Sequence, residues 1–220
     1  MKRIISILVL CSSLSIAYAQ GNSQGASDPE AKKLLEAVTA KFKTYSTVKA
    51  GFTFQVEDAN GKVQGTKTGT AFLKGNQYKV ELTDQEIYCD GKNVWTYDKG
   101  SNEVQVSKFD ASENSFTPQK VFTNFYDKDF LYKLNDEKKQ AGKTVQEVEL
   151  TPTDKSRTFF KILAYVDKVT KNIVSTKLFE KNGGRYVYTV TSFTPNTKLE
   201  NNVFTFDAKK YPGVEVIDLR

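Results

Sequence analysis

The sequence predicts a mainly β (α+β) fold, in which a single curved antiparallel sheet, or an open barrel, is built in one domain. Aromatic side chains, which pack well on pleated faces, are frequent: 15 Phe and 11 Tyr stand against a mean hydropathy of -0.49. Segments of alternating apolar and polar residues recur between turns rich in Gly and Asn, and they predict about 10–11 strands. With 220 residues the chain is long enough to bury a core without metals or disulfides.

The N-terminus has the three parts of an export signal. Two basic residues are followed by an apolar run from Ile4 to Leu10, and residues 17–19 read Ala-Tyr-Ala, a small-x-small cleavage site. We therefore expect a signal peptide at 1–19, cleaved after Ala19, and a flexible linker at 20–27. A membrane anchor is the alternative, but the apolar run is too short to span a bilayer. A lipidated Cys11 is a second alternative, which the large Leu10 before it disfavours.

The missing residue types exclude many functions. The sequence contains no His, so no Ser-His-Asp or Cys-His nucleophile and no imidazole zinc site can form. After signal cleavage Cys89 is the one remaining thiol, and we expect it to act as a small buried hydrophobic residue. The net charge of +6 then falls to +4, with Lys spread among Glu and Asp, so no nucleic-acid partner is expected.

One helix is predicted directly after the linker. Asp28 can cap it, Pro29 fits its first turn, and one apolar face follows at three-to-four spacing. That face is formed by Leu34, Leu35, Val38, Phe42 and Tyr45. Packing on the sheet is the favoured interpretation, and a helix lying on a membrane surface is the alternative.

From Val48 the apolar period changes to two, which is typical of strands. Short turns such as Asn60-Gly61 separate the segments and require antiparallel neighbours, so a meander is predicted. The predicted strands are 48–57, 62–74, 77–82, 86–89, 93–97, 103–106, 144–150, 158–166, 172–179, 185–193 and 203–206.

The segment from Ser115 to Phe130 interrupts this pattern. Its apolar residues recur at helical spacing and predict one or two short helices. We expect them to form a lid over the sheet, with Val121, Phe122, Phe125 and Phe130 facing inward and the charged residues in water.

Several predicted strands carry apolar side chains on both faces, as adjacent pairs such as Val94-Trp95 show. A sheet that is apolar on both sides needs a cover or a ligand. The sequence alone leaves two interpretations open, a ligand-free solid core and an apolar cavity.

Several segments resemble the LolA family of periplasmic lipoprotein carriers. The run Gly69–Val80 is similar to its second and third strands, and Cys89–Asp98 (Cys-Asp-Gly-Lys-Asn-Val-Trp-Thr-Tyr-Asp) to its Asp-Gly-x-x-Leu-Trp-x-Tyr-Asp hairpin. Phe204–Phe206 with Pro212–Asp218 resembles its closing segment, and the helix leading into Phe52–Gln55 also fits. The resemblance covers the whole mature chain.

This resemblance implies an unclosed barrel with a helical lid, which binds lipoprotein acyl chains in the periplasm. It implies an inner-membrane lipoprotein-releasing ABC transporter as partner and leaves open whether an outer-membrane acceptor takes part; a monomer without cofactor, metal or catalytic residues is expected. The family's Arg-Pro pair after the second strand is replaced here by Lys74-Gly75-Asn76, and Lys74 is the candidate lid contact. The candidate cavity residues are Phe52, Phe54, Leu73, Tyr78, Val80, Trp95, Phe122, Phe125 and Phe206.

Two other functions remain as alternatives. A related half-barrel receptor or sensor that binds lipid would share the fold. A β-rich hydrolase would need paired carboxylates, for which Asp127 with Asp129, or Glu147 with Glu149, are the candidates. Alternation with Val148 makes the two glutamates more typical of a solvated strand face.

Overall fold

The computed structural model describes residues 27–110, 129–140 and 142–220. Within these residues the chain forms one α-helix, two short 3-10 helices and one twelve-stranded sheet. The predicted signal peptide, the linker up to residue 26 and residues 115–128 of the predicted lid lie outside the described residues.

The elements are α1 (Pro29–Lys43), β1 (Val48–Glu57), β2 (Val63–Lys74), β3 (Gln77–Leu82), β4 (Gln85–Cys89), β5 (Asn93–Asp98), β6 (Glu103–Lys108), β7 (Phe130–Gln140), β8 (Lys143–Pro152), β9 (Phe159–Asp167), β10 (Ile173–Glu180), β11 (Arg185–Pro195), η2 (Asn201–Phe204), η3 (Ala208–Lys210) and β12 (Glu215–Asp218).

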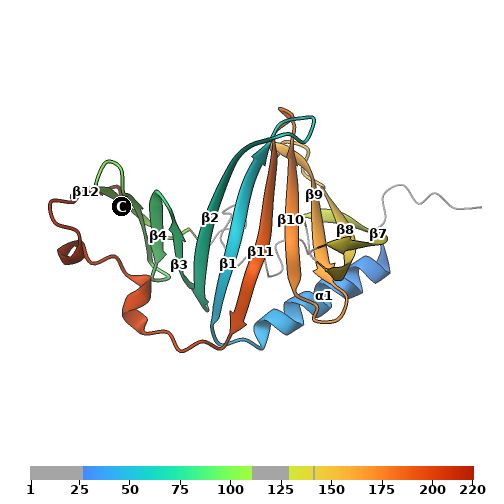
Figure 1. Cartoon of the computed structure of the whole chain (residues 1–220), viewed down its shortest axis with the longest axis horizontal. Helices are drawn as coiled ribbons and strands as arrows, with labels where there is room; N and C mark the ends of the chain where they lie inside the picture. The colour runs from blue at the N-terminus through green and yellow to red at the C-terminus, as the bar shows by residue number, and fades with distance from the viewer. Residues whose placement is uncertain (1–26, 111–128, 141) are drawn as a thin grey trace, which may run out of the picture.

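The sheet consists of two antiparallel meanders joined along one seam (Figure 1). Its strand order is β12-β6-β5-β4-β3-β2-β1-β11-β10-β9-β8-β7. The seam is the pairing of β1 with β11, which runs from Val48↔Pro195 to Glu57↔Arg185. The predicted curved antiparallel sheet is therefore confirmed, and β12 is added in parallel beside β6.

Helix α1 is fixed to the edge strand β7 through its cap. The side-chain Oδ1 of Asp28 accepts the backbone N–H of Glu30 at 2.8 Å, as the capping pattern predicts. Its Oδ2 accepts the N–H of Leu134 at 3.1 Å, and its own N–H donates to the carbonyl of Tyr132 at 2.8 Å. One carboxylate thus begins the helix and satisfies part of the open edge of β7.

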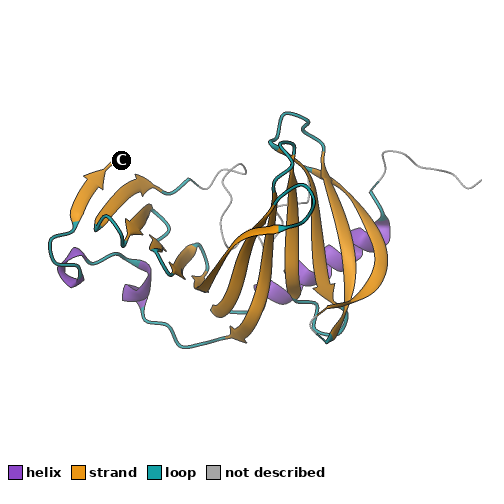
Figure 2. Cartoon of the chain, turned by 45° about the horizontal axis from the view of Figure 1, so that its top comes forward, coloured by secondary structure: helices purple, strands orange, loops and turns teal. Residues whose placement is uncertain are grey.

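Two hydrophobic cores lie on opposite faces of the sheet. The larger core is on the face that carries α1, here called the helix face, and includes Leu35, Val38 and Leu150. The smaller core, on the opposite face of β4–β6, is formed by Tyr88, Tyr97, Val104 and Phe206. Figure 2 shows the long strands as a curved wall and the chain after β11 crossing to the shorter strands.

Two expectations about secondary structure were wrong, and one strand was not predicted. Residues 203–206 form no strand: η2 ends at Phe204, which is fully buried, and Phe206 is nearly so. The Phe206 ring packs against Tyr88 and Tyr97, so the period-two spacing of the two Phe residues serves burial and not a hydrogen-bonded ladder. Phe130 does not end a helix but opens β7, a strand in which the charged run at 136–139 obscures the alternation. The four-residue β12 was also not predicted.

Candidate functional site

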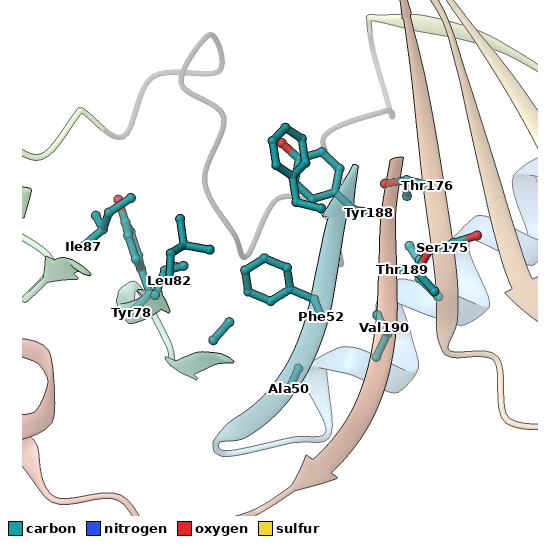
Figure 3. A pocket seen from close by; sticks show the side chains of 14 residues that line it. Ala50, Phe52, Tyr78, Leu82, Ile87, Ser175, Thr176, Tyr188, Thr189 and Val190 are labelled. Carbon is teal, nitrogen blue, oxygen red and sulfur yellow. The ribbon is translucent and has the colours of Figure 1, made fainter. Parts of the chain in front are cut away.

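An apolar cavity of about 330 Å³ opens on the helix face (Figure 3). Its volume is at the lower end of the range of small-molecule sites, about 300–1,000 Å³. Strands β1–β4 supply one side and β10 and β11 the other, so the seam between the meanders runs through its wall. The lining residues are Ala50, Phe52, Phe54, Ala71, Tyr78, Val80, Leu82, Ile87, Ile173, Ser175, Thr176, Tyr188, Thr189 and Val190.

The Phe52 ring has its position because its neighbour on β2 is a glycine. Phe52 pairs with Gly69 on one side and with Val190 on the other. A Cβ atom on Gly69 would lie 2.7 Å from Cζ of Phe52 and 2.6 Å from the carbonyl oxygen of Glu81. No side chain fits in that space, so the missing side chain at residue 69 allows the ring to cover β2 and face the cavity.

A second aromatic group closes another part of the wall. The ring centroids of Phe54 and Tyr188, which are register partners, lie 4.8 Å apart, and those of Phe54 and Tyr186 lie 5.8 Å apart. Pairs at these distances contribute beyond the area that they bury. These ring contacts join the two meanders across this wall.

The cavity lining contains no charged side chain among the described residues. Burial raises the pKa of the Tyr78 hydroxyl above its usual range, and the neighbouring Cys89 acts in the same direction. Burial also raises the pKa of Tyr188. Both phenols are therefore neutral at physiological pH, and the cavity offers hydrogen bonds but no ionic partner.

The sequence-predicted cavity residues divide into three groups. Phe52, Phe54, Tyr78 and Val80 line the cavity, and Leu73 is buried in the same core without lining it. Trp95 and Phe206 lie on the opposite face, in the smaller core, and are not brought to the cavity. The reason is alternation: Val94 packs in the core of the helix face, so Trp95 must point the other way.

The remaining candidates fall partly outside the described residues. Phe122 and Phe125 lie there, and so does most of the predicted lid. Lys74 is half-buried at the end of β2, where it pairs with Gln77. Its role as a lid contact stays a prediction.

Most of the lining was not predicted from the sequence. Small residues such as Ala50 and Ala71 carry no signal on their own. Knowledge of the strand register would have identified them as lining residues, because Ala50 pairs with Ala71 and Ala71 pairs with Val80 across three adjacent strands.

The carboxylates proposed for the hydrolase alternative are engaged in structural contacts. Glu147 is 4% exposed, accepts from Nδ2 of Asn135 at 3.0 Å and pairs with Lys138, so its predicted place on a solvated face was wrong. Burial acts to raise the pKa of Glu147, but hydrogen bonds, first that of Lys138, outweigh it and hold the pKa below its usual value. Asp129 binds Arg157 at 2.7 Å, and Asp127 lies outside the described residues.

The described part of the chain contains neither a metal site nor a membrane-spanning helix. These residues contain no group of three or more Cys, Asp or Glu side chains placed to hold a metal ion. They also contain no helix long and apolar enough to cross a membrane. Cys89 is fully buried, as expected, and its Sγ accepts the N–H of Gly91.

Comparison with known proteins gives one consistent result. Residues 43–207 match the family described as "Outer membrane lipoprotein carrier protein LolA". The outer-membrane lipoprotein carrier protein of Cupriavidus necator is 29% identical over 166 residues, which cover 73% of this chain and 75% of that protein. The carrier of Shewanella sediminis is 31% identical over 120 residues, 52% of each chain.

A solved structure shares the fold at low sequence identity. An uncharacterized conserved protein from Thermus thermophilus superposes with a TM-score of 0.59, covering 86% of this chain and 99% of its own. The two sequences are 11% identical, so the similarity concerns the fold alone.

Proposed function

The chain belongs to the LolA family, and from this premise we propose that it is a carrier that binds the acyl chains of lipoproteins in the cavity of the helix face. The observation that carries the proposal is the cavity itself, whose lining in the described residues is mostly apolar and carries no charge. A buried methylene group contributes about 0.8 kcal/mol. Burying on the order of a dozen would offer roughly 10 kcal/mol before the costs of ordering.

The finer parts of the proposal follow from the family. We propose that the protein acts in the periplasm after removal of residues 1–19, without catalysis and as a monomer. It would accept lipoproteins from an ABC transporter of the inner membrane and deliver them to the outer membrane. A related half-barrel receptor or sensor that binds lipid is the alternative, and delivery of cargo between membranes distinguishes the two.

Co-purification tests the proposal directly. The exported protein is purified from its own cells, and mass spectrometry identifies lipoproteins bound to it. Ile87→Asp places a carboxylate in the cavity, whereas Val63→Asp, at a 47% exposed position of β2, is the matched control. We expect lipoproteins with the wild type and the control but not with Ile87→Asp, because an unpaired charge in an apolar site is costly.

Circular dichroism of each variant verifies that it is folded. If no lipoprotein accompanies the folded wild type, or if the two Asp variants carry the same amount, the cavity is not the binding site.

A further inference from the structure

One wall of the cavity carries a hydroxyl group that makes no hydrogen bond within the described part of the protein. Thr176 on β10 is 7% exposed, and its Oγ1 has no hydrogen-bond partner among the described residues. Figure 3 shows this oxygen on the side of Thr176 that faces Tyr188. No side-chain nitrogen or oxygen of the described residues is both buried and without a partner, so this oxygen is open to the cavity, where a bound ligand can reach it and form a hydrogen bond with it.

The neighbouring Ser175 provides a contrast. Its side chain exchanges hydrogen bonds with the amide of Gln140, at 2.9 Å from Nε2 and 3.2 Å from Oε1. By strand alternation Ser175 points away from the face that Thr176 occupies. Of these two adjacent hydroxyls, the inward one is therefore available for binding.

The wall of the cavity formed by β10 and β11 carries two neighbouring hydroxyl-bearing side chains. Thr176 pairs with Tyr188 across β10 and β11, so the two hydroxyl-bearing side chains are neighbours on the same face. The wall formed by β3 and β4 presents Val80, Leu82 and Ile87, with one hydroxyl group, that of Tyr78 beside Cys89. A ligand with one apolar and one hydrogen-bonding end would thus meet two neighbouring hydroxyl-bearing side chains on the wall of β10 and β11.

Thr176 and Tyr188 lie where two strands separate. Pairing of β10 with β11 stops at Ser175↔Thr189, whereas β11 continues to pair with β1 as far as Pro195 (Figure 1). Thr176 is the next residue along from this fork. The polar end of a bound ligand would therefore lie beside the break in the sheet, and its apolar end against the continuous part.

We propose that Thr176 donates a hydrogen bond to the carbonyl oxygen of an acyl ester or amide, and that the cavity selects neutral acyl chains linked through a carbonyl over free fatty acids. A carboxylate would enter a cavity whose described lining offers no cation, and its charge would remain uncompensated. An ester or amide carbonyl needs one neutral donor, which Thr176 supplies. The inference rests on the proposed function and adds which acyl compounds the site accepts.

Displacement of a fluorescent apolar probe tests it. N-phenyl-1-naphthylamine is bound to the purified protein at pH 8 and displaced with methyl laurate or sodium laurate, which differ at the carboxyl end. We expect the ester to displace the probe at a concentration at least about 10-fold lower than the carboxylate. Thr176→Val should weaken ester binding about 5-fold more than it weakens probe binding, which is the effect of one neutral hydrogen bond.

Two further variants make the result specific. Thr176→Ser keeps the hydroxyl and should restore ester affinity to within about 2-fold of the wild type. Thr191→Val changes an exposed threonine of β11 that does not line the cavity and should have no effect. If the probe and the ester bind but laurate competes equally, or if Thr176→Val behaves as the wild type, carbonyl recognition is overturned while the carrier proposal stands. If neither the probe nor the ester binds, both carbonyl recognition and the carrier proposal are overturned.

Discussion

The hydroxyl oxygens of Tyr88 and Tyr211 lie 2.8 Å apart, although 123 residues separate them in the chain, and both hydroxyls hydrogen-bond to Oε2 of Glu86. Nζ of Lys99 lies 3.1 Å from the other carboxylate oxygen. The ring of Phe206 stacks on that of Tyr211, with centroids 4.6 Å apart. These contacts attach the C-terminal segment to the opposite face of β4, so it does not compete for the helix face.

Removing one hydroxyl from this cluster should loosen the C-terminal segment. Tyr211→Phe deletes a hydrogen bond to a charged group, and we expect the free energy of unfolding to fall by about 1.5 kcal/mol in urea titrations. Tyr132→Phe is the matched control, because the Tyr132 hydroxyl makes no hydrogen bond among the described residues. Equal stability of the two variants would contradict the assigned role of the cluster.

The same cluster predicts a loss of stability in acid. Burial acts to raise the pKa of Glu86, but hydrogen bonds from Tyr88, Tyr211 and Lys99 outweigh it and hold the pKa below its usual value. The contribution is therefore complete above the unfolded-state pKa of about 4.3 and is lost as pH falls through the lower folded-state value. Urea midpoints measured from pH 7 to pH 3 should decline less steeply in Glu86→Gln than in the wild type.

A surface variant provides the control for that experiment. Glu36→Gln removes one negative charge from the exposed face of α1 and should follow the wild-type pH profile. Parallel profiles for Glu86→Gln and the wild type would exclude Glu86 as a source of the acid sensitivity.

Two glycines of β2 should respond differently to the same substitution. Gly69→Ala places a Cβ within 2.8 Å of Phe52, Glu81 and Leu82, whereas Gly65→Ala meets nothing within 4 Å. We expect Gly69→Ala to cost about 1–3 kcal/mol, as overpacking does, and to weaken probe binding by displacing the Phe52 ring. Gly65→Ala should leave both quantities nearly unchanged; a similar loss from both variants would show that β2 simply requires Gly.

The cap of α1 should stabilise β7 as well as the helix. Asp28→Ala removes acceptors for Glu30 and Leu134, and we expect a loss of about 1–2 kcal/mol together with faster hydrogen exchange at the Leu134 amide. Asp28→Asn keeps an oxygen acceptor and should lose less. Glu36→Ala, on the exposed face of the same helix, is the control, and unchanged exchange at Leu134 in Asp28→Ala would contradict the link to β7.

Local patterns predicted the strands well where alternation and turns coincide. The run from Val48 to Val56 and its Asn60-Gly61 turn gave β1 and its hairpin correctly. The strand β7 was missed because its second half is charged and is held by contacts made elsewhere, such as the pair between Lys138 and Glu147. Tertiary contacts of this kind leave no periodic pattern in the segment itself.

The cavity could be predicted only in part, because alternation does not say which face is covered. Trp95 and Phe206 were reasonable aromatic candidates, yet both lie on the opposite face of the sheet, which the C-terminal segment covers with Tyr211. Thr176 gives no signal in its local sequence, Val-Ser-Thr-Lys. Its position inside the cavity follows from pairing with Tyr188, which requires the register of two strands.

The seam between β1 and β11 has a consequence for how the molecule folds. At its end the backbone N–H of Ser46 donates to Oδ1 of Asn196 at 2.9 Å, a contact that spans 150 residues. Closing so long a loop costs entropy before any pairing along the seam offsets it, and folds dominated by such contacts form slowly. The complete cavity wall cannot exist while only the first meander has been made. A chain emerging N-terminus first therefore exposes apolar strand surface until its last long strand, β11, arrives.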